Sequence, residues 1–293
     1  MILSNQYYIR SLLDYKNRSM INRLKKILKI YNKNTLVDIF LLALKKINII
    51  KFSSFIEREK ININQKIINI TKFKIIYGPY KNTIYYQKAY FDNSGNKLLG
   101  FYESQIQQKI IELKKKFNLD FLINFGCGDG FHVLGLIKKK IFKKGLVYDI
   151  NPHSKKILNK NLELNNIKNR VEVFDEANFN YLKNNQDKIN YKKILFLIDI
   201  EGLEFNLLNA QNLKYFKNSC LIIENHDFFI SKKKDIKKFW KLLKSNYSIE
   251  IVNNSFRNPF VINKIDNFND DERWLTMSEG RLCNQNWIVC IPK

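Results

Sequence analysis

Cysteine is scarce in this chain, and its four copies are scattered. They are Cys127, Cys220, Cys283 and Cys290, and no two of them form a C-x-x-C pair. Three of the four fall in or beside segments that we expect to be strands or a glycine turn. This usage indicates reduced thiols in a cytosolic protein rather than a disulfide framework.

Long apolar runs are absent as well. The longest, Ile39–Leu44, is followed by Lys45 and Lys46 and falls far short of the ~18 residues that a membrane span needs. The N-terminus lacks the basic and then apolar pattern of a secretory signal. The chain also has no internal repeat and no Pro- or Gly-rich linker. We therefore expect a cytoplasmic protein with one main domain and no signal peptide or transmembrane segment.

Acidic residues are also in deficit. The 293 residues include 27 Asp and Glu against 51 Lys and Arg, which gives a formal charge of +24. Such an excess often marks a nucleic-acid or anionic-membrane partner. The lysines are spread along the whole chain, however, and Lys, Asn and Ile are residues that an AT-rich genome favours. A functional basic surface and compositional drift are both open interpretations of the charge.

Residues 1–65 are predicted to form a basic helical extension. Apolar residues between Met20 and Tyr31 recur at helical spacing, with Arg23 and three lysines on the opposite face. Such a helix either packs on the main domain or touches anionic lipid or a partner, so peripheral membrane contact is one prediction. Residues 66–117 are predicted to lead into the core through strands, turns and a final helix.

From residue 118 to 293, apolar runs alternate with amphipathic stretches. The expected strands are 121–125, 145–149, 171–174, 194–199, 220–224, 247–252 and 287–291. Helical crossovers between the first five strands predict an α/β fold with a parallel, doubly wound sheet. Residues of about 253–285 show little regular pattern, and a loop of that length in a compact domain is typically functional.

The segment from Asn124 to Gly130, with the sequence Asn-Phe-Gly-Cys-Gly-Asp-Gly, is the most informative part of the chain. It follows an apolar run and precedes a helical pattern over 131–140, and Asp149 ends the next apolar run. A strand, a glycine turn, a helix and an acid after the second strand suit a nucleoside-bearing cofactor. The glycines let the backbone pass close to the ligand, and the acid accepts hydrogen bonds from ribose hydroxyls.

The spacing of these glycines resembles a known family. It is one residue tighter than the dinucleotide fingerprint and is similar to the first motif of class I S-adenosylmethionine-dependent methyltransferases. Three further segments resemble the FkbM family of these enzymes, and they are Asp149-Ile150-Asn151-Pro152, Asp199-Ile200-Glu201-Gly202-Leu203-Glu204 and Ile222-Ile223-Glu224-Asn225-His226. The resemblance covers residues 120–227. It implies a mostly parallel, seven-stranded Rossmann-like sheet, closed by an antiparallel last strand, with S-adenosylmethionine as the cofactor.

The resemblance also implies which residues hold the cofactor. The turn would contribute Asn124, Gly126, Cys127, Gly128 and Gly130, and Asp149 would bind the ribose. Asn124 replaces an acid that is often found two residues before the first glycine. After the third strand, Asp175 or Glu176 would accept a hydrogen bond from the adenine amino group, unless both are solvated loop acids.

Asp199 is placed at the carboxyl end of the fourth strand, where open α/β sheets bind their ligands. It can meet the cofactor or the substrate. Glu201 is a candidate substrate contact. Glu204 is either a solvated helix residue or an electrostatic cap for the start of a helix.

The ends of strands four and five predict an activating group. In catechol-type O-methyltransferases, which this pattern resembles, an acid and an acid–Asn pair bind a divalent cation, matching Asp199 and Glu224-Asn225 here. Oxygen ligands suit Mg²⁺ or Mn²⁺, and the cation would lower the pKa of a substrate hydroxyl. His226 is the alternative, as a neutral general base, and a metal-free site that only holds substrate is the third.

The candidate catalytic residues are therefore Asp199, Glu224 and His226, while His132 and His153 are predicted to be structural. The 253–285 stretch is predicted to be a substrate lid or a solvated hairpin. Arg273, Trp274 and Arg281 carry the lid prediction, because guanidinium groups bind carboxylate or phosphate in a forked geometry and Trp stacks on sugars or bases. Tyr102 and Glu103 would reach the site from the other side.

Three functions fit these observations. The first is methyl transfer to a hydroxyl oxygen of a small molecule or glycan. The second is nucleic-acid methylation, which the charge suggests. It is weakened because Asp199-Ile200-Glu201-Gly202 stands where enzymes that methylate exocyclic base amines carry an Asn/Asp-Pro-Pro-aromatic motif. The third is a binding module that has lost its chemistry, for which Asn124 is the one hint.

Overall fold

A computed structural model describes residues 37, 39–40, 43–44, 55–87, 94–185, 190–230, 233–254, 257–281 and 283–293. The chain divides into two compact units, Met1–Lys60 and Ile61–Lys293. Helix α3 (Phe55–Thr71) crosses the boundary between them. The basic helix predicted between Met20 and Tyr31 lies outside the described residues. Among the described residues, no helix has both the length and the apolar character that crossing a membrane requires.

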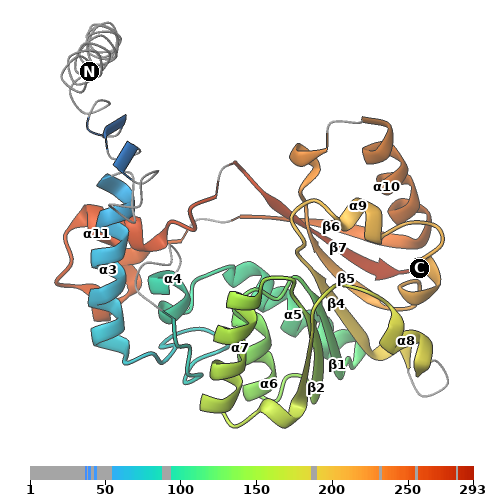
Figure 1. Ribbon diagram of the computed structural model, residues 1–293, viewed down its shortest axis with the longest axis horizontal. Coiled ribbons are helices and arrows are strands. Elements are labelled where there is room, and N and C mark those ends of the chain that lie inside the picture. The colour runs from blue at the N-terminus through green and yellow to red at the C-terminus, as the bar shows by residue number, and fades with distance from the viewer. Residues whose placement is uncertain are drawn as a thin grey trace, which may run out of the picture. The chain divides into compact units, whose positions relative to one another are not determined.

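The second unit is built around a seven-stranded sheet in the order β3-β2-β1-β4-β5-β7-β6 (Figure 1). The strands are β1 (Phe121–Phe125), β2 (Lys144–Tyr148), β3 (Val171–Phe174), β4 (Ile194–Ile198), β5 (Cys220–Glu224), β6 (Tyr247–Asn253) and β7 (Asn286–Pro292). The first five pair in parallel, and β7 runs antiparallel to both β5 and β6. The predicted doubly wound, mostly parallel sheet is confirmed, including its antiparallel closing strand.

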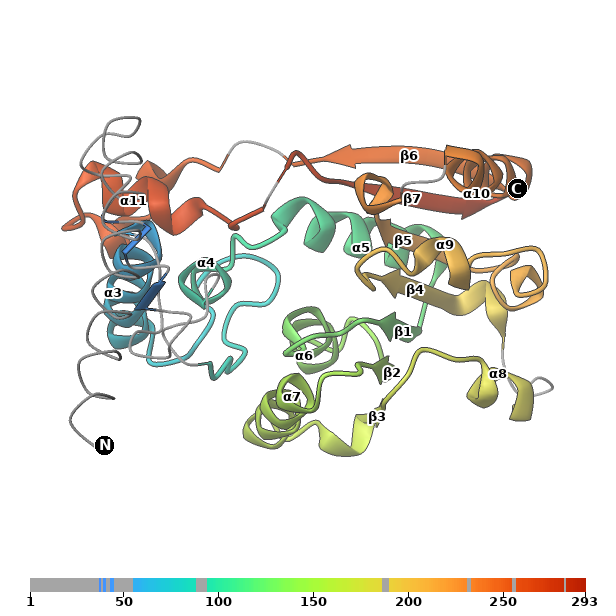
Figure 2. The same ribbon diagram turned by 45° about the horizontal axis from the view of Figure 1, so that its top comes forward.

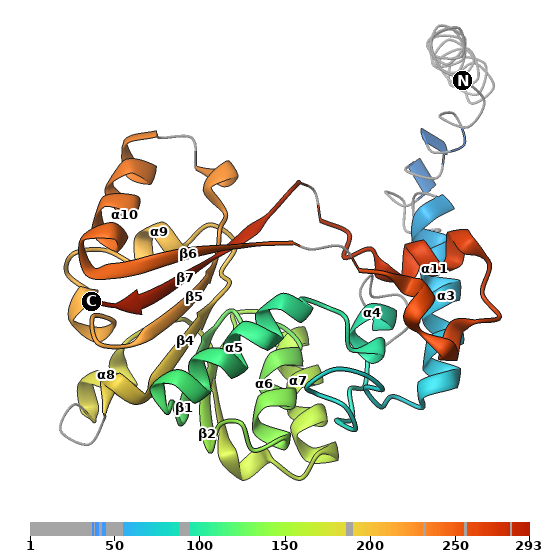
Figure 3. The same cartoon turned by 180° about the vertical axis from the view of Figure 1, so that it is seen from behind.

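Helices cover both faces of this sheet (Figure 2, and from behind in Figure 3). On one face, α5 (Ser104–Phe117), α6 (Phe131–Lys138) and α7 (Pro152–Leu164) pack against inward side chains such as Leu122 and Leu197. On the other, α8 (Asn180–Asn184) and α10 (Lys233–Asn246) pack against alternate residues such as Ile123 and Ile198. Because both faces are covered, the central strands are continuously apolar, which is why their runs were visible in the sequence.

Short elements complete the unit. They are α9 (Glu204–Leu207) and the 3₁₀ helices η1 (Lys168–Arg170), η3 (Tyr191–Lys193), η4 (Leu213–Tyr215) and η5 (Asp227–Phe229). Of these, η1 leads directly into β3 and η3 leads directly into β4.

The strands predicted between residues 66 and 100 are not formed in the described part of that segment. Helix α3 continues to Thr71, one isolated bridge joins Lys74 and Ile84, and α4 spans Ser94–Leu99. The extended backbone at Ile84 and Tyr86 pairs instead with the side-chain amides of Asn161 in α7 and of Asn165, the C-cap of that helix. Asn165 bonds both polar groups of Ile84, at 2.9 and 2.7 Å, and Asn161 does the same for Tyr86, at 2.7 and 3.0 Å. The backbone is thereby satisfied without a partner strand.

The stretch predicted as a lid is more regular than its sequence pattern indicated. It contains η6 (Pro259–Val261), η7 (Asn263–Ile265) and α11 (Asp270–Met277), and Asn269 and Glu272 form a capping box at the start of α11. Its side chains Ile262, Ile265 and Phe268 are buried. The Asn96 amide of α4 donates to the Met277 carbonyl at 3.3 Å, and α11 lies beside α4, away from the strands (Figure 3).

Candidate active site

The glycine turn connects β1 to α6, and its three glycines all have positive φ, at 75°, 52° and 88° for Gly126, Gly128 and Gly130. A Cβ at Gly126 would lie 1.6 Å from the Asp199 carbonyl oxygen, and one at Gly130 would lie 2.3 Å from Leu158. A Cβ at Gly128 would meet nothing within 4 Å. Two glycines therefore permit close packing, while the middle one borders open space.

Asp149 follows β2 and holds the turn in place. Its Oδ2 accepts a hydrogen bond from the Gly128 amide at 2.7 Å, and its Oδ1 accepts one from the Asn151 amide at 2.8 Å. Asn151 in turn caps α7 with its side chain. Asp175 and Glu176 are exposed, and Asp175 pairs with Lys155. None of these three acids lines the cavity described next, and their predicted contacts with ribose and adenine stay predictions.

A cavity of about 240 Å³ opens at the carboxyl ends of β1 and β4. Its lining includes predicted site residues and others that were not predicted. The residues are Gln87, Lys97, Tyr102, Glu103, Asn124, Gly126, Cys127, Gly128, Asp129, Phe131, His132, His153, Ser154, Ile157, Leu197, Asp199 and Trp287. Asn124 joins two strands there, because its amide donates to the Leu197 carbonyl at 3.1 Å. Burial, with Asp149 and Asp129 nearby, raises the pKa of the Cys127 thiol, which makes it a poor nucleophile.

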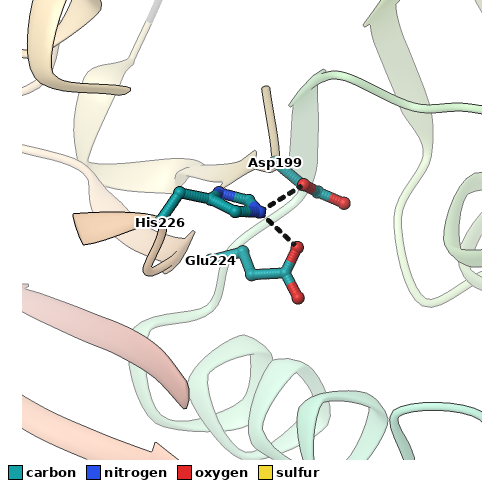
Figure 4. A group of neighbouring side chains, drawn as sticks. All are labelled: Asp199, Glu224 and His226. Carbon is teal, nitrogen blue, oxygen red and sulfur yellow. Dashed lines mark ion pairs between the residues drawn. The ribbon is translucent and has the colours of Figure 1, made fainter. Parts of the chain in front are cut away.

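Asp199, Glu224 and His226 follow or end β4 and β5 and converge (Figure 4), and Asp199 also lines this cavity. His226 is 1% exposed, and its Nε2 lies 3.3 Å from Glu224 Oε2 and 3.9 Å from Asp199 Oδ1. Its Nδ1 faces Glu204 Oε1 at 3.0 Å. Glu204 is itself buried and accepts from the Ile200 amide at 2.9 Å. Glu204 is therefore neither solvated nor only a helix cap, since it also orients the histidine.

The carboxylates around His226 set its protonation. Burial alone would lower the pKa of His226, but the carboxylates of Glu204 and Glu224 outweigh it and raise that pKa to about 10. For Glu224 the balance is the opposite. Burial would raise the pKa of this carboxyl, but His226, Asp199 and Arg281 hold that pKa at about 2. The enclosed Oδ1 of Asp199 and the charge of Glu224 raise the pKa of Asp199 well above its usual value. Without a bound cation, these carboxylates favour the protonated form of His226 at neutral pH, and its role as a neutral general base stays a prediction.

The same three residues can hold a cation. Each offers one ligand atom, and these atoms all lie within 4.8 Å of one another. Among the described residues, Asp199 Oδ1 and His226 Nε2 are buried and have no hydrogen-bond partner. The predicted set was Asp199, Glu224 and Asn225, and His226 converges on the two acids of that set. Asn225 lies beside it, with a buried and unpartnered Oδ1.

Arg281 lies in the connection between α11 and β7, called here the C-terminal loop, and links it to this site. Its Nη2 donates to Glu103 Oε1 at 2.6 Å, its Nε donates to Glu279 Oε2 at 2.8 Å, and its Nη1 pairs with Glu224. Glu103 adopts φ 47°, is 3% exposed and contacts His132 Nε2 at 2.7 Å. Left-handed backbone is unusual for Glu and indicates that surrounding contacts fix this residue. Tyr102 and Glu103 therefore line the cavity. His132, which was predicted to be structural, is buried beside Glu103 and Tyr80 but also lines it.

The other two lid residues lie elsewhere. The guanidinium of Arg273 sits 5.1 Å from the Phe260 ring centroid, and Trp274 packs edge-on against the same ring at 5.8 Å. Neither lines the cavity. Glu201 lies at φ 53° with its side chain 78% exposed and its Oε2 3.5 Å from His226 Nε2, so it does border the cluster.

Gln87, Lys97 and Asp129 are three of the cavity residues that sequence reasoning missed as site residues. Asp129 was part of the quoted glycine motif and was the available signal. Gln87 and Lys97 come from the lead-in segment, and no local pattern marks them. They reach the cavity only because the fold returns that segment to the glycine turn.

No family model matches the chain. Over 115 residues it is 27% identical to a tRNA (guanine(37)-N(1))-methyltransferase from Giardia intestinalis, covering 38% of this chain. The match spans only 25% of that relative's length.

Solved structures with a similar arrangement include O-methyltransferases. One from Bacillus cereus in complex with SAH has a TM-score of 0.44 at 13% identity and covers 64% of this chain and 80% of its own. TomG from Streptomyces achromogenes, in complex with SAM, has a TM-score of 0.44 at 6% identity and covers 65% and 81%. These values do not assign the chain to a family.

Proposed function

We propose that this chain transfers a methyl group from S-adenosylmethionine to a hydroxyl oxygen of a small molecule or saccharide. The observation that carries the proposal is the cavity at the carboxyl ends of β1 and β4, which the glycine turn borders and Asp199 lines. Open α/β sheets bind ligands at this edge. The Gly126-x-Gly128-x-Gly130 spacing and the resemblance to FkbM enzymes favour a methyl donor over a dinucleotide.

The residues present fit such a cofactor. The space beside Gly128 is open, so a ligand can approach the backbone there. The bound cofactor would supply an electrophilic methyl group. The chain would supply alignment, because fixing donor and acceptor in one geometry removes much of the entropic cost of the reaction. It would also supply carboxylates next to the acceptor.

We infer further that the Asp199, Glu224 and His226 cluster binds a divalent cation, which orients the acceptor hydroxyl. A cation would replace the proton on His226, and four carboxylates within reach of that ring offset its charge. A ligand set with one imidazole suits Mn²⁺ better than Mg²⁺. Because binding releases a proton, Mn²⁺ affinity is expected to rise between pH 7 and 9.

Titration with Mn²⁺, followed by calorimetry and by loss of the free-ion electron paramagnetic resonance signal, tests the cation site. His226→Gln should abolish binding, whereas Asn225→Ala should leave it nearly intact. If Asn225→Ala abolished Mn²⁺ binding and His226→Gln did not, the ligand set predicted from sequence would be the correct one. No binding by the unmodified chain would remove the cation from the proposal.

The cofactor is tested by calorimetry with S-adenosylhomocysteine, with NAD as the matched control. We expect saturable binding of S-adenosylhomocysteine and none of NAD. Labelled S-adenosylmethionine offered with a panel of hydroxylated small molecules and saccharides then identifies the acceptor. Affinity for NAD alone, or for neither nucleoside, would overturn the proposal.

Nucleic acid is the second candidate acceptor, and two observations favour it. The chain matches part of a tRNA methyltransferase, and helix α10 exposes six lysines, namely Lys233, Lys234, Lys237, Lys238, Lys241 and Lys244. The acids around His226 oppose it, because they would repel phosphate. A gel shift with bulk tRNA at 50 and 200 mM salt, together with label transfer to tRNA, separates the two acceptors.

A further inference from the structure

A second ion pair lies in the cavity, apart from the His226 cluster. Lys97 of α4 places its Nζ 2.8 Å from Asp129 Oδ2 in the glycine turn, and each side chain is 12% exposed. Gln87 Nε2 donates to the same Asp129 oxygen at 2.9 Å. All three residues line the cavity. This pair therefore faces the space where a ligand would bind.

Aromatic rings fix the position of the Lys97 ammonium group. Its Nζ lies 4.8 Å from the ring centroid of Tyr102, 5.5 Å from that of Tyr85 and 5.9 Å from that of Phe131. Ring faces attract a cation most strongly when it is shielded from water. The lysine is thus held by four groups in one place.

The charges around the cavity leave one position for an anion. Among the described residues that line it, Lys97 is the only Lys or Arg, while Glu103, Asp129 and Asp199 contribute carboxylates. A ligand carboxylate would be repelled elsewhere and attracted to Lys97. A ligand ammonium group beside it would find Asp129.

We propose that Lys97 and Asp129 form the subsite for the amino-acid end of the cofactor, with Lys97 binding the α-carboxylate and Asp129 the α-ammonium. This inference rests on the proposed function, since S-adenosylmethionine carries both charges on one carbon. Binding exchanges one ion pair for two. Lys97 and Asp129 each keep a partner of opposite charge. This matters because an unpaired charge in a shielded site is costly. Helix α4, outside the sheet, thereby takes part in cofactor binding.

The test uses ligands that differ only at this end. 5′-Methylthioadenosine keeps the nucleoside and sulfur of S-adenosylhomocysteine but lacks the amino-acid group. We expect the unmodified chain to bind S-adenosylhomocysteine about ten- to a hundredfold more tightly than methylthioadenosine, as charge-assisted hydrogen bonds predict. Lys97→Met should remove most of this preference and leave the affinity for methylthioadenosine nearly unchanged. Lys139→Met, at an exposed lysine, is the control and should change neither.

Each outcome has one meaning. If the unmodified chain binds neither ligand, the proposed function fails. If it binds both equally, or if Lys97→Met weakens both equally or neither, the subsite is wrong while the proposed function stands. Should Lys97→Met not fold, Asp129→Asn serves instead, with the same loss of preference expected. Decarboxylated S-adenosylmethionine, which retains the ammonium group, should then be insensitive to Lys97 and sensitive to Asp129.

Discussion

At the scale of single residues, the glycines of the turn differ in what a side chain would meet. Alanine at Gly128 has room but must adopt φ 52°, at a cost of ~1 kcal/mol and ~2–4 °C in Tm. We expect Gly128→Ala to fold and to bind S-adenosylhomocysteine at least about tenfold more weakly, because its methyl group enters the ligand space. Calorimetry and thermal unfolding measure the two effects.

Gly126→Ala is the matched variant. Its Cβ would overlap the Asp199 carbonyl oxygen, so the backbone must move, and a loss of more than ~3 kcal/mol is expected. Normal cofactor affinity in Gly128→Ala, or normal stability in Gly126→Ala, would contradict this assignment of the turn.

His226 gives a pH-dependent prediction. Its pKa is raised to about 10 in the folded chain by Glu204 and Glu224, against burial. A raised pKa contributes stability that is complete below the unfolded value of ~6.5 and is lost as the pH rises through the folded value. In the presence of a chelator, the Tm difference between the unmodified chain and His226→Gln should therefore be largest near pH 6 and shrink toward pH 10. A difference that stays constant over this range would show that His226 is neutral.

At the scale of elements, the C-terminal loop is anchored rather than free. Arg281 compensates Glu103, Glu224 and Glu279, whose side chains are at most 5% exposed. Arg281→Met would leave these acids without their common partner, and a loss of ~3–5 kcal/mol is expected at pH 7 from removing one side of a buried pair.

Chemical denaturation at pH 7 and pH 5 measures this loss, which should shrink at the lower pH as the uncompensated acids become protonated. Arg273→Met is the control, because Arg273 stacks on Phe260 and pairs with none of these acids. Equal effects of the two substitutions would mean that Arg281 does not anchor the loop.

At the scale of the whole molecule, the sequence predicted the sheet better than its surroundings. The strands β1 to β5 were found nearly at their ends, because burial on both faces produces continuous apolar runs. Polar residues at strand ends, such as Asp199 and Glu224, were found because they stand where these apolar runs end. The lead-in was mistaken for strands because the amides of Asn161 and Asn165, which replace a strand partner, lie about 75 to 81 positions away.

The site residues that were not predicted from the sequence were missed for the same reason, because their partners are distant in the chain. Lys97 meets Asp129 across 32 positions, and Arg281 meets Glu103 across 178. No periodicity or motif encodes such pairings, since they depend on how the chain returns to the sheet. The approach of His226 to Asp199 and Glu224 likewise depends on how the chain turns after β5, which the sequence order does not specify.

The uneven exposure of the four thiols has a practical consequence. Cys283 is exposed, whereas Cys127, Cys220 and Cys290 are buried with raised pKa values. A maleimide dye would react at Cys283 in preference to the others and would stand two positions from Arg281. The natural chain thus carries its own labelling point beside the anchored loop, so ligand-dependent changes there can be followed by fluorescence without an engineered residue.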